Sequence, residues 1–365
     1  MSISLDILDL PVGANPDPDE FVQAAMRWHF SSETGSPFWL ARARTLDFDP
    51  LTEVRSMDDL RHFPNVAPEL RSVSVRDLLP QAYGARPNLA RVFESGGTTG
   101  DAKRVVVTQD WLRILVEAVE KNLDAHGVPR NAIWLGTIPT GPHLVGELFR
   151  RTASSHGDLG LLVDLDPRWV RKLITSGRVQ EADDYAEHLV DQTENLLRTQ
   201  PVGVLVTTPP LLERMARRDR LVELVNERVR AIRWGGTQLD PDTRLLLQEE
   251  VYPECVLMGN YGSTMMLGVA GERPGLSATD PCIFDLLSPY LTCTVVDPET
   301  RRPVDYGDRG QVLVSHVSRS FLMPNNLERD VATRLPGLPG YVGDALADIA
   351  PVTAFENEPV IEGVY

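Results

Sequence analysis

Cysteine is scarce in this sequence. The 365 residues contain three cysteines, Cys255, Cys282 and Cys293, and their odd number and wide spacing argue against a disulfide framework. No Cys-x-x-Cys or His-x-x-x-His pair occurs, so a structural zinc site has no support. We expect free thiols in a protein of a reducing compartment.

Long apolar runs are missing as well. No stretch approaches the roughly 20 consecutive apolar residues of a membrane-spanning helix. The first twenty residues, MSISLDILDLPVGANPDPDE, are acidic and lack the basic start of a secretory signal peptide. The sequence therefore predicts a cytoplasmic protein that does not bind a membrane.

Positive charge is the third deficit. Lys and Arg number 36 against 52 Asp and Glu, which gives a net charge of −16. Because such a surface repels a phosphate backbone, nucleic acid is not an expected partner. A nucleotide is not excluded, since a local loop can bind its phosphates whatever the sign of the overall field.

The sequence does contain an alternation of apolar strands and amphipathic helices. Short β-branched runs, such as VGVLVTT at 202–208 and RAIRWGG at 230–236, alternate with helical patterns, and residues 211–229 are predicted as one helix. This order is typical of a parallel sheet covered by helices. Hairpin-like strands follow after about residue 280. We predict an α/β core over residues 1–280 and a β-rich subdomain over residues 281–365.

One loop concentrates flexible and hydroxylated residues. The segment FESGGTTGDAKRVV, residues 93–106, has glycines that let backbone N–H groups approach a ligand closely. Lys103 adds a mobile charge that suits phosphate oxygens. An exposed hairpin turn has the same composition, so both interpretations stay open. The spacing differs from GxxxxGK[ST], which disfavours a P-loop NTPase.

The loop resembles the phosphate loop, roughly [ST]SG[ST]TGxPKG, of the acyl-adenylate-forming enzymes, the superfamily of acyl-CoA synthetases, adenylation domains and luciferases. Five further segments resemble other motifs of this family in the same order: PTGPHLVG, RWGGTQLD, GNYGSTM, DRGQVLVSHVSRSFLMPNNLERDVATR and GYVGDALAD. Ordered agreement over roughly residues 90 to 350 is more specific than any single motif. The resemblance implies the large N-terminal domain of this fold, with stacked parallel-rich sheets, helices and a small β-rich C-terminal subdomain.

The resemblance also implies roles for individual residues, with ATP and Mg²⁺ as cofactors. Lys103 and Thr264 would contact phosphates, His143 would lie beside the reacting carboxylate, Tyr261 would stack on adenine, and Asp344 would bind the ribose. Taken singly, such residues are more often packing or turn residues. The other nucleotide-binding residues would be Ser95, Gly96, Gly97, Thr98, Thr99, Gly100, Gly235, Gly236 and Gly262. The acid pocket would be lined by His143, Trp234, Asn260 and Met265, and Trp134 and Met266 are further candidates for its wall.

Two departures from the family pattern stand out. The motif YGxTE ends in a glutamate that holds Mg²⁺, whereas Met265 stands at this position and its thioether is a poor ligand for a hard cation. The chain also ends at Tyr365, about where the relatives have a hinge. We therefore expect the mobile C-terminal lid domain, with its adenylation lysine, to be absent.

This combination resembles the stand-alone adenylation proteins of phenazine antibiotic biosynthesis, of the griseoluteic acid type, and the adenylating component of two-protein aryl-acid reductases. The implied function is activation of an aryl acid of secondary metabolism as acyl-AMP, followed by transfer to a separate NADPH-dependent reductase that releases an aldehyde. Two alternatives stay open. One is a ligase that passes the acyl group to an amine or a carrier-protein thiol; the other is a non-catalytic nucleotide-binding subunit of a reductase complex.

Overall fold

The computed structural model describes residues 4–95, 101–352, 354–355 and 358–359. Short 3₁₀ helices lie at Leu5–Asp9, Met57–His62, Ala67–Arg71 and Gln81–Tyr83. The α-helices are α1 (Pro18–Phe30), α2 (Pro37–Ala43), α3 (Gln109–Ala125), α4 (Leu144–Ser155), α5 (Pro167–Thr175), α6 (Val179–Thr199), α7 (Pro209–Ala216), α8 (Asp219–Arg228) and α9 (Pro241–Leu246), with a π turn at Leu247–Val251. Within the described ranges, no helix has both the length and the apolar character needed to cross a bilayer.

A six-stranded sheet forms the centre of the α/β part, in the order β4-β3-β5-β6-β7-β8. All neighbouring strands are parallel except β8, which pairs antiparallel with β7. The apolar runs predicted as strands supply it: β3 (Ile133–Ile138), β4 (Gly160–Asp164), β5 (Val202–Thr207), β6 (Ala231–Gly235), β7 (Val256–Ser263) and β8 (Gly268–Gly271). The predicted mixed α/β class with a parallel-rich sheet is therefore confirmed.

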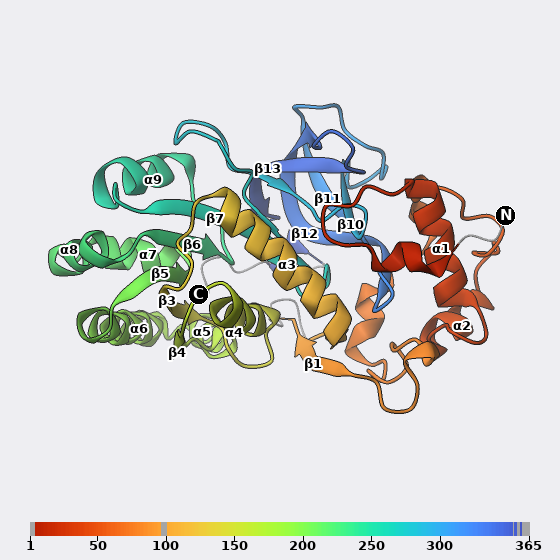
Figure 1. Cartoon of the computed structure of the whole chain (residues 1–365), viewed down its shortest axis with the longest axis horizontal. Helices are drawn as coiled ribbons and strands as arrows, with labels where there is room; N and C mark the ends of the chain where they lie inside the picture. Colours follow the sequence, from red (N-terminus) through yellow and green to blue (C-terminus); the bar gives the residue numbers. More distant parts are fainter. Residues whose placement is uncertain (1–3, 96–100, 353, 356–357, 360–365) are drawn as a thin grey trace.

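Helices cover both faces of this sheet (Figure 1). Successive strand residues point to opposite faces, and they separate into two buried clusters accordingly. One cluster joins α3 and α4 to Trp134, Val204, Ala231 and Met258. The other joins α6, α7 and α8 to Leu135, Leu205, Ile232 and Leu257.

The helix predicted over residues 211–229 is two helices, α7 and α8. The chain leaves the helical conformation at Arg218, whose φ of −114° and ψ of 99° are extended. The Arg218 guanidinium pairs there with Glu187, Asp191 and Glu194 on α6. These ion pairs favour the break, which the apolar periodicity alone does not reveal.

A five-stranded antiparallel sheet follows, in the order β10-β11-β12-β13-β9. Its strands are β9 (Ile283–Asp285), β10 (Leu291–Val296), β11 (Arg309–Val317), β12 (Leu322–Pro336) and β13 (Asp344–Pro351). Two short pairs complete the strands: β1 (Leu89–Glu94) with β2 (Arg104–Thr108), and β14 (Ala354–Phe355) with β15 (Glu358–Pro359). The β-rich C-terminal portion is thus confirmed, while the boundary at residue 280 stays a prediction.

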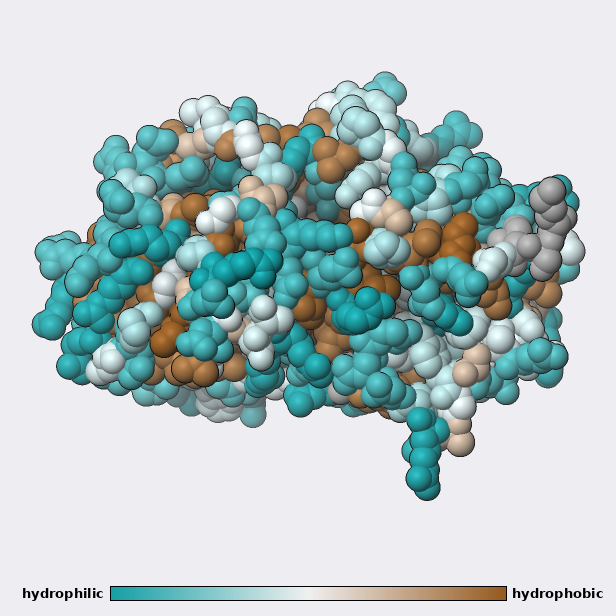
Figure 2. Space-filling view, viewed as in Figure 1, coloured by the Kyte–Doolittle hydropathy of each residue, from teal (hydrophilic) through white to brown (hydrophobic). Residues whose placement is uncertain are grey.

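The N-terminal helices pack on the antiparallel sheet, at the opposite end of the molecule from α8 (Figure 1). The Trp28 indole N–H donates to the Arg319 carbonyl at 2.8 Å, and the Trp39 indole N–H donates to the Leu322 carbonyl at 3.1 Å. One apolar cluster contains buried residues from α1, from the parallel sheet and from the antiparallel sheet. On the surface, polar side chains cover most of the face of the molecule shown in Figure 2.

Two buried histidines make the stability of this packing sensitive to acid. His29 Nε2 donates to the Ser318 carbonyl at 2.7 Å, and His316 Nδ1 donates to the Met266 carbonyl at 2.8 Å. Burial lowers the pKa of His29 to about 4 and that of His316 to about 3. Since these values lie below the unfolded pKa of about 6.5, the unfolded chain binds protons first as the pH falls, and stability is lost below about pH 6.5.

We expect the His29→Gln variant to lose less stability in acid than the parent protein. The glutamine amide can keep the hydrogen bond to Ser318 but cannot titrate. Between pH 7 and pH 5 the parent should lose about 2 kcal/mol more of its free energy of unfolding than the variant. Urea unfolding at the two pH values measures this difference, and equal losses would contradict it.

Candidate active site

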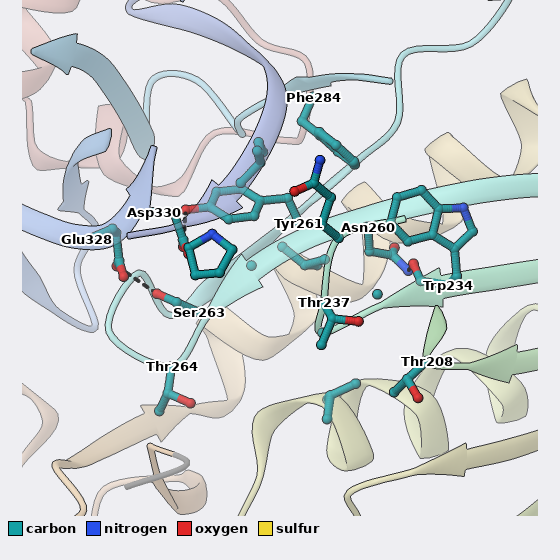
Figure 3. A pocket seen from close by; sticks show the side chains of 18 of the residues that line it. Thr208, Trp234, Thr237, Asn260, Tyr261, Ser263, Thr264, Phe284, Glu328 and Asp330 are labelled. Atoms are coloured by element: carbon teal, nitrogen blue, oxygen red, sulfur yellow. Dashed lines mark hydrogen bonds between the residues drawn. The ribbon is translucent and has the colours of Figure 1, made fainter. Parts of the chain in front are cut away.

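A cavity of about 390 Å³ opens at the carboxyl ends of the parallel strands. Ile138, Thr207 and Gly235, the last residues of β3, β5 and β6, line it, and residues 326–330 of β12 and 348–351 of β13 close it from the antiparallel sheet. Figure 3 shows part of its wall. The volume and the place in the sheet are typical of a small-molecule site in an α/β protein.

The glycine-rich loop is the connection of the β1–β2 hairpin, and its base reaches the cavity. The Ser95 N–H donates to the Lys103 carbonyl and the Lys103 N–H donates to Ser95 Oγ, both at 3.0 Å. Ser95, Asp101 and Lys103 line the cavity, and Lys103 is only 8% exposed. The base of the hairpin therefore lies at the cavity. The predicted residues Gly96, Gly97, Thr98, Thr99 and Gly100 lie outside the described residues.

His143 lies beside this hairpin. It is the N-cap residue of α4 and lines the cavity, and the Glu94 N–H donates to the neighbouring Pro142 carbonyl at 2.8 Å. Burial lowers the pKa of His143, with a smaller contribution from the positive charge of Arg168. The imidazole is therefore neutral at pH 7. Thr264, another predicted residue, lines the cavity too, and its hydroxyl donates to the Glu94 carbonyl at 3.5 Å.

The predicted glycine pair ends β6 at the cavity edge. Gly236 has a φ of +91°, a region that strongly favours glycine. A Cβ on Gly235 would lie 3.0 Å from the Asn260 carbonyl oxygen, so the neighbouring strand β7 leaves little room for a side chain. Asn260 fixes the pair further, because its amide donates to the Trp234 carbonyl at 3.0 Å. The turn therefore brings bare backbone to the cavity.

Two carboxylates that sequence reasoning did not select face Tyr261 and its neighbours (Figure 3). The Tyr261 hydroxyl donates to Asp330 Oδ2 at 3.0 Å, and the Ser263 hydroxyl donates to Glu328 Oε1 at 2.7 Å. Burial raises the pKa of Glu328 to about 7, and the nearby charge of Asp330 adds to this shift. Burial also raises the pKa of Asp330. The cavity thus holds two carboxyl groups whose pKa values lie above their usual ranges.

Asp344, predicted to bind the ribose, is not among the residues that line the cavity. It begins β13, where its Oδ2 accepts from Arg334 Nε at 2.8 Å and from the Val295 N–H at 3.1 Å. It is a buried structural carboxylate that ties three strands together. The acidic residues that β12 and β13 place at the cavity are Glu328, Asp330 and Asp348.

The predicted acid-pocket residues His143, Trp234, Asn260 and Met265 all line the cavity, as does Gly262. Two others weighed for that pocket do not. Trp134 is fully buried in the cluster under α3 and α4, and Met266 packs in the main core. Apolar composition suggested all four large side chains equally. Trp134 lies near the start of β3 and Trp234 beside the last residue of β6, while Met265 and Met266 lie in the turn between β7 and β8.

The cavity also collects buried polar atoms without a hydrogen-bond partner among the described residues. They are Arg233 Nε, Arg244 Nε, Trp234 Nε1, Asn260 Oδ1 and the hydroxyls of Thr207, Thr208 and Thr237. Buried polar groups in proteins are nearly always satisfied, so a concentration of unsatisfied ones in one cavity points to a polar ligand. No sequence motif distinguishes these residues.

Comparison with solved structures finds similar chains. An open conformation of 2-hydroxyisobutyryl-CoA ligase, in complex with 2-HIB-AMP and CoA, aligns with a TM-score of 0.64 over 90% of this chain and 68% of that chain, at 14% identity. ATP-bound MatB from Rhodopseudomonas palustris aligns with a TM-score of 0.50 over 72% of this chain and 48% of that one, at 18% identity.

The fold is that of the adenylate-forming ligases. At these identities the likeness establishes the fold and not the substrate. No family model matches the sequence. No curated protein matches it either.

Proposed function

We propose that the protein activates a carboxylic acid with ATP, giving an acyl-AMP and pyrophosphate. One observation carries the proposal: the Lys103 hairpin, His143, Tyr261 and Asp330 come from four separate parts of the chain and line one cavity at the strand ends. A nucleotide needs a loop that binds its phosphates and a carboxylate that binds its ribose. An acid needs a neutral donor such as an imidazole beside its carboxylate, and this cavity combines these groups.

The nucleotide would lie along the edge formed by β6, β7 and β12. The bare backbone of Gly235 and Gly236 would accept the flat adenine against Tyr261. Asp330 is hydrogen-bonded to Tyr261 and would accept from the ribose hydroxyls, the role that the sequence motif suggested for Asp344. The solved relative MatB binds ATP, which supports nucleotide binding in this fold.

The chemistry would rest on position and charge. The acid's carboxylate oxygen attacks the α-phosphorus of ATP, and the bond to the pyrophosphate oxygen breaks. Two anions must approach each other, so the protein has to hold them in line and neutralise charge. Lys103 would neutralise the phosphates, Thr264 would orient the α-phosphate, and neutral His143 would donate to the acid's carboxylate.

Mg²⁺ would accompany ATP, and Glu328 in the cavity wall offers an oxygen donor for it. Met265 is unsuitable, whereas Glu328 presents a carboxylate held by Ser263 and by Asn326, whose amide donates at 2.8 Å. Carboxylate oxygen is the ligand type that Mg²⁺ prefers. Among the described residues, no three His, Cys, Asp or Glu side chains form a metal site. Glu328 would therefore hold the ion together with the phosphates, whose charge the ion neutralises when bound.

The acid is proposed to be an aryl acid, and the acyl acceptor a separate NADPH-dependent reductase that releases an aldehyde. Trp234 and Phe149 in the cavity wall suit a flat ring. The resemblance to phenazine-type adenylation proteins supports a role in secondary metabolism. A carrier-protein thiol or an amine is the alternative acceptor, and the same adenylation step would precede either transfer.

The test is ATP–pyrophosphate exchange by the protein with a panel of aryl acids, and with fatty acids as controls. Exchange that depends on one group of aryl acids is the expected result. Saturable ATP binding without exchange, even after addition of a candidate reductase, would instead favour a non-catalytic nucleotide-binding subunit. Exchange with fatty acids alone would contradict the aryl-acid proposal.

A further inference from the structure

Arg233 is a buried arginine without a counter-ion among the described residues. It lies on β6, lines the cavity, and is only 7% exposed. Its Nε has no hydrogen-bond partner, and its guanidinium forms no ion pair within the part of the chain that the structure describes. Burial alone lowers the pKa of Arg233 to about 10, so the group stays positively charged at neutral pH.

A second buried arginine, Arg244, differs from Arg233 because it pairs with a carboxylate of the protein. Arg244 also lines the cavity, and its guanidinium donates to Glu272 Oε1 at 2.5 Å and to the Asp280 carbonyl at 2.9 Å. Buried charges in proteins are normally paired in this way. Arg233 breaks the rule inside a ligand-sized cavity, so its partner is expected to be a ligand.

The position of Arg233 separates it from the reacting end of the cavity. It is paired in register with Val206 and Met258 and stands one pleat deeper than Gly235. Leu148 and Phe149 line the same cavity on α4, and Leu148 lies roughly 8 Å along the helix from its N-cap, His143. The cavity therefore brings the apolar side chains of α4 and the Arg233 guanidinium together.

We infer that Arg233 binds a second carboxylate of the acid that this cavity activates, so the substrate class is an aromatic dicarboxylic acid. The inference rests on the proposed acyl-adenylation. A guanidinium and a carboxylate match as two planar groups with parallel hydrogen bonds. One carboxylate would react beside His143, the ring would lie between the apolar walls, and the other carboxylate would pair with Arg233. The unsatisfied hydroxyls of Thr207 and Thr208 add donors to the same cavity.

The experiment compares matched acids on the parent protein, Arg233→Met and Arg233→Lys. The probes are benzene-1,3-dicarboxylate, benzene-1,4-dicarboxylate and naphthalene-2,6-dicarboxylate, each beside the acid in which a methyl group replaces the second carboxylate. Thermal unfolding without ATP reports binding, and ATP–pyrophosphate exchange reports activation. One diacid should raise the melting temperature of the parent and support exchange, and Arg233→Met should lower kcat/KM for it by about 100-fold. Arg233→Lys should retain part of the kcat/KM for this diacid. The kcat/KM for the matched methyl acid should change little in Arg233→Met.

A readout without ligand separates binding from a structural role. Arg233→Met removes an unpaired buried charge, so the variant alone should unfold at a higher temperature than the parent. A lower melting temperature, or undiminished use of the diacid by Arg233→Met, would overturn the assignment. If no acid supports exchange but a diacid stabilises the parent and not Arg233→Met, adenylation fails and the Arg233 assignment stands. If monoacids support exchange and no diacid binds, the assignment fails and adenylation stands.

Discussion

Replacing Lys103 by alanine should lower ATP–pyrophosphate exchange by about 100-fold or more, the usual cost of losing one charge-stabilising donor. Lys103 lies at the base of the hairpin loop, almost fully buried, where backbone hydrogen bonds to Ser95 fix its position. Its ammonium would neutralise phosphate charge that grows as pyrophosphate leaves. The effect should therefore fall on kcat more than on the KM for ATP.

The matched control is Lys121→Ala. Lys121 is a half-exposed lysine on α3 that pairs with Glu117 and does not line the cavity. Its loss should leave exchange unchanged, and circular dichroism should show both variants folded. An exchange rate in Lys103→Ala equal to that of the Lys121 control would remove the hairpin loop from the proposed mechanism.

Replacing Glu328 by glutamine should raise the Mg²⁺ concentration needed for half-maximal exchange by at least about 10-fold. Glutamine keeps the shape of the side chain and can still accept from Ser263 and Asn326, but it lacks the charge that a hard cation requires. High Mg²⁺ should restore most of the rate. Independently of activity, the electron paramagnetic resonance of Mn²⁺ should show weaker binding of the ion with ATP to the variant.

Glu147→Gln provides the control for the loss of a buried carboxylate. Glu147 is buried on α4, pairs with Arg151 at 3.0 Å and does not line the cavity. Its substitution should cost some stability and leave Mn²⁺ affinity unchanged. Equal Mn²⁺ affinity in the parent and Glu328→Gln would exclude Glu328 as the ligand, and the ion would then be held by the phosphates and other groups.

The residues that sequence analysis could place at the cavity belong to short contiguous motifs at strand ends. Tyr261 and the Gly235–Gly236 pair follow apolar strands directly, and the carboxyl ends of parallel strands meet at one edge of the sheet. Once β6 and β7 are identified, the position of these residues follows. Lys103 was predictable for a related reason, since it closes a glycine-rich turn between two apolar runs.

Glu328 and Asp330 could not be placed in the same way. They alternate along β12, which puts both on one face of the strand. Which face turns to the cavity depends on the pairing of β12 with β11, and that register shifts twice. Asp344 differs from both. A glycine and an aspartate in the expected order predicted a ribose site there, and in the fold this carboxylate pairs with Arg334.

Arg233 was hidden for a different reason. It lies within the apolar run of β6, and one charged residue in a buried strand does not by itself indicate a binding site. Only the three-dimensional arrangement shows that no carboxylate among the described residues faces it. Unpaired charges and unsatisfied hydroxyls are properties of the assembled cavity, and a sequence pattern does not contain them.

The most direct test of acyl-adenylate formation follows the oxygen atoms of the acid. An acid that supports exchange is labelled with ¹⁸O in its carboxylate and incubated with the protein, ATP and hydroxylamine, which attacks the acyl carbon and releases AMP. Attack of the carboxylate on the α-phosphorus predicts AMP that carries one ¹⁸O atom, together with unlabelled pyrophosphate. ADP together with ¹⁸O-labelled phosphate would show attack on the γ-phosphorus and contradict the account.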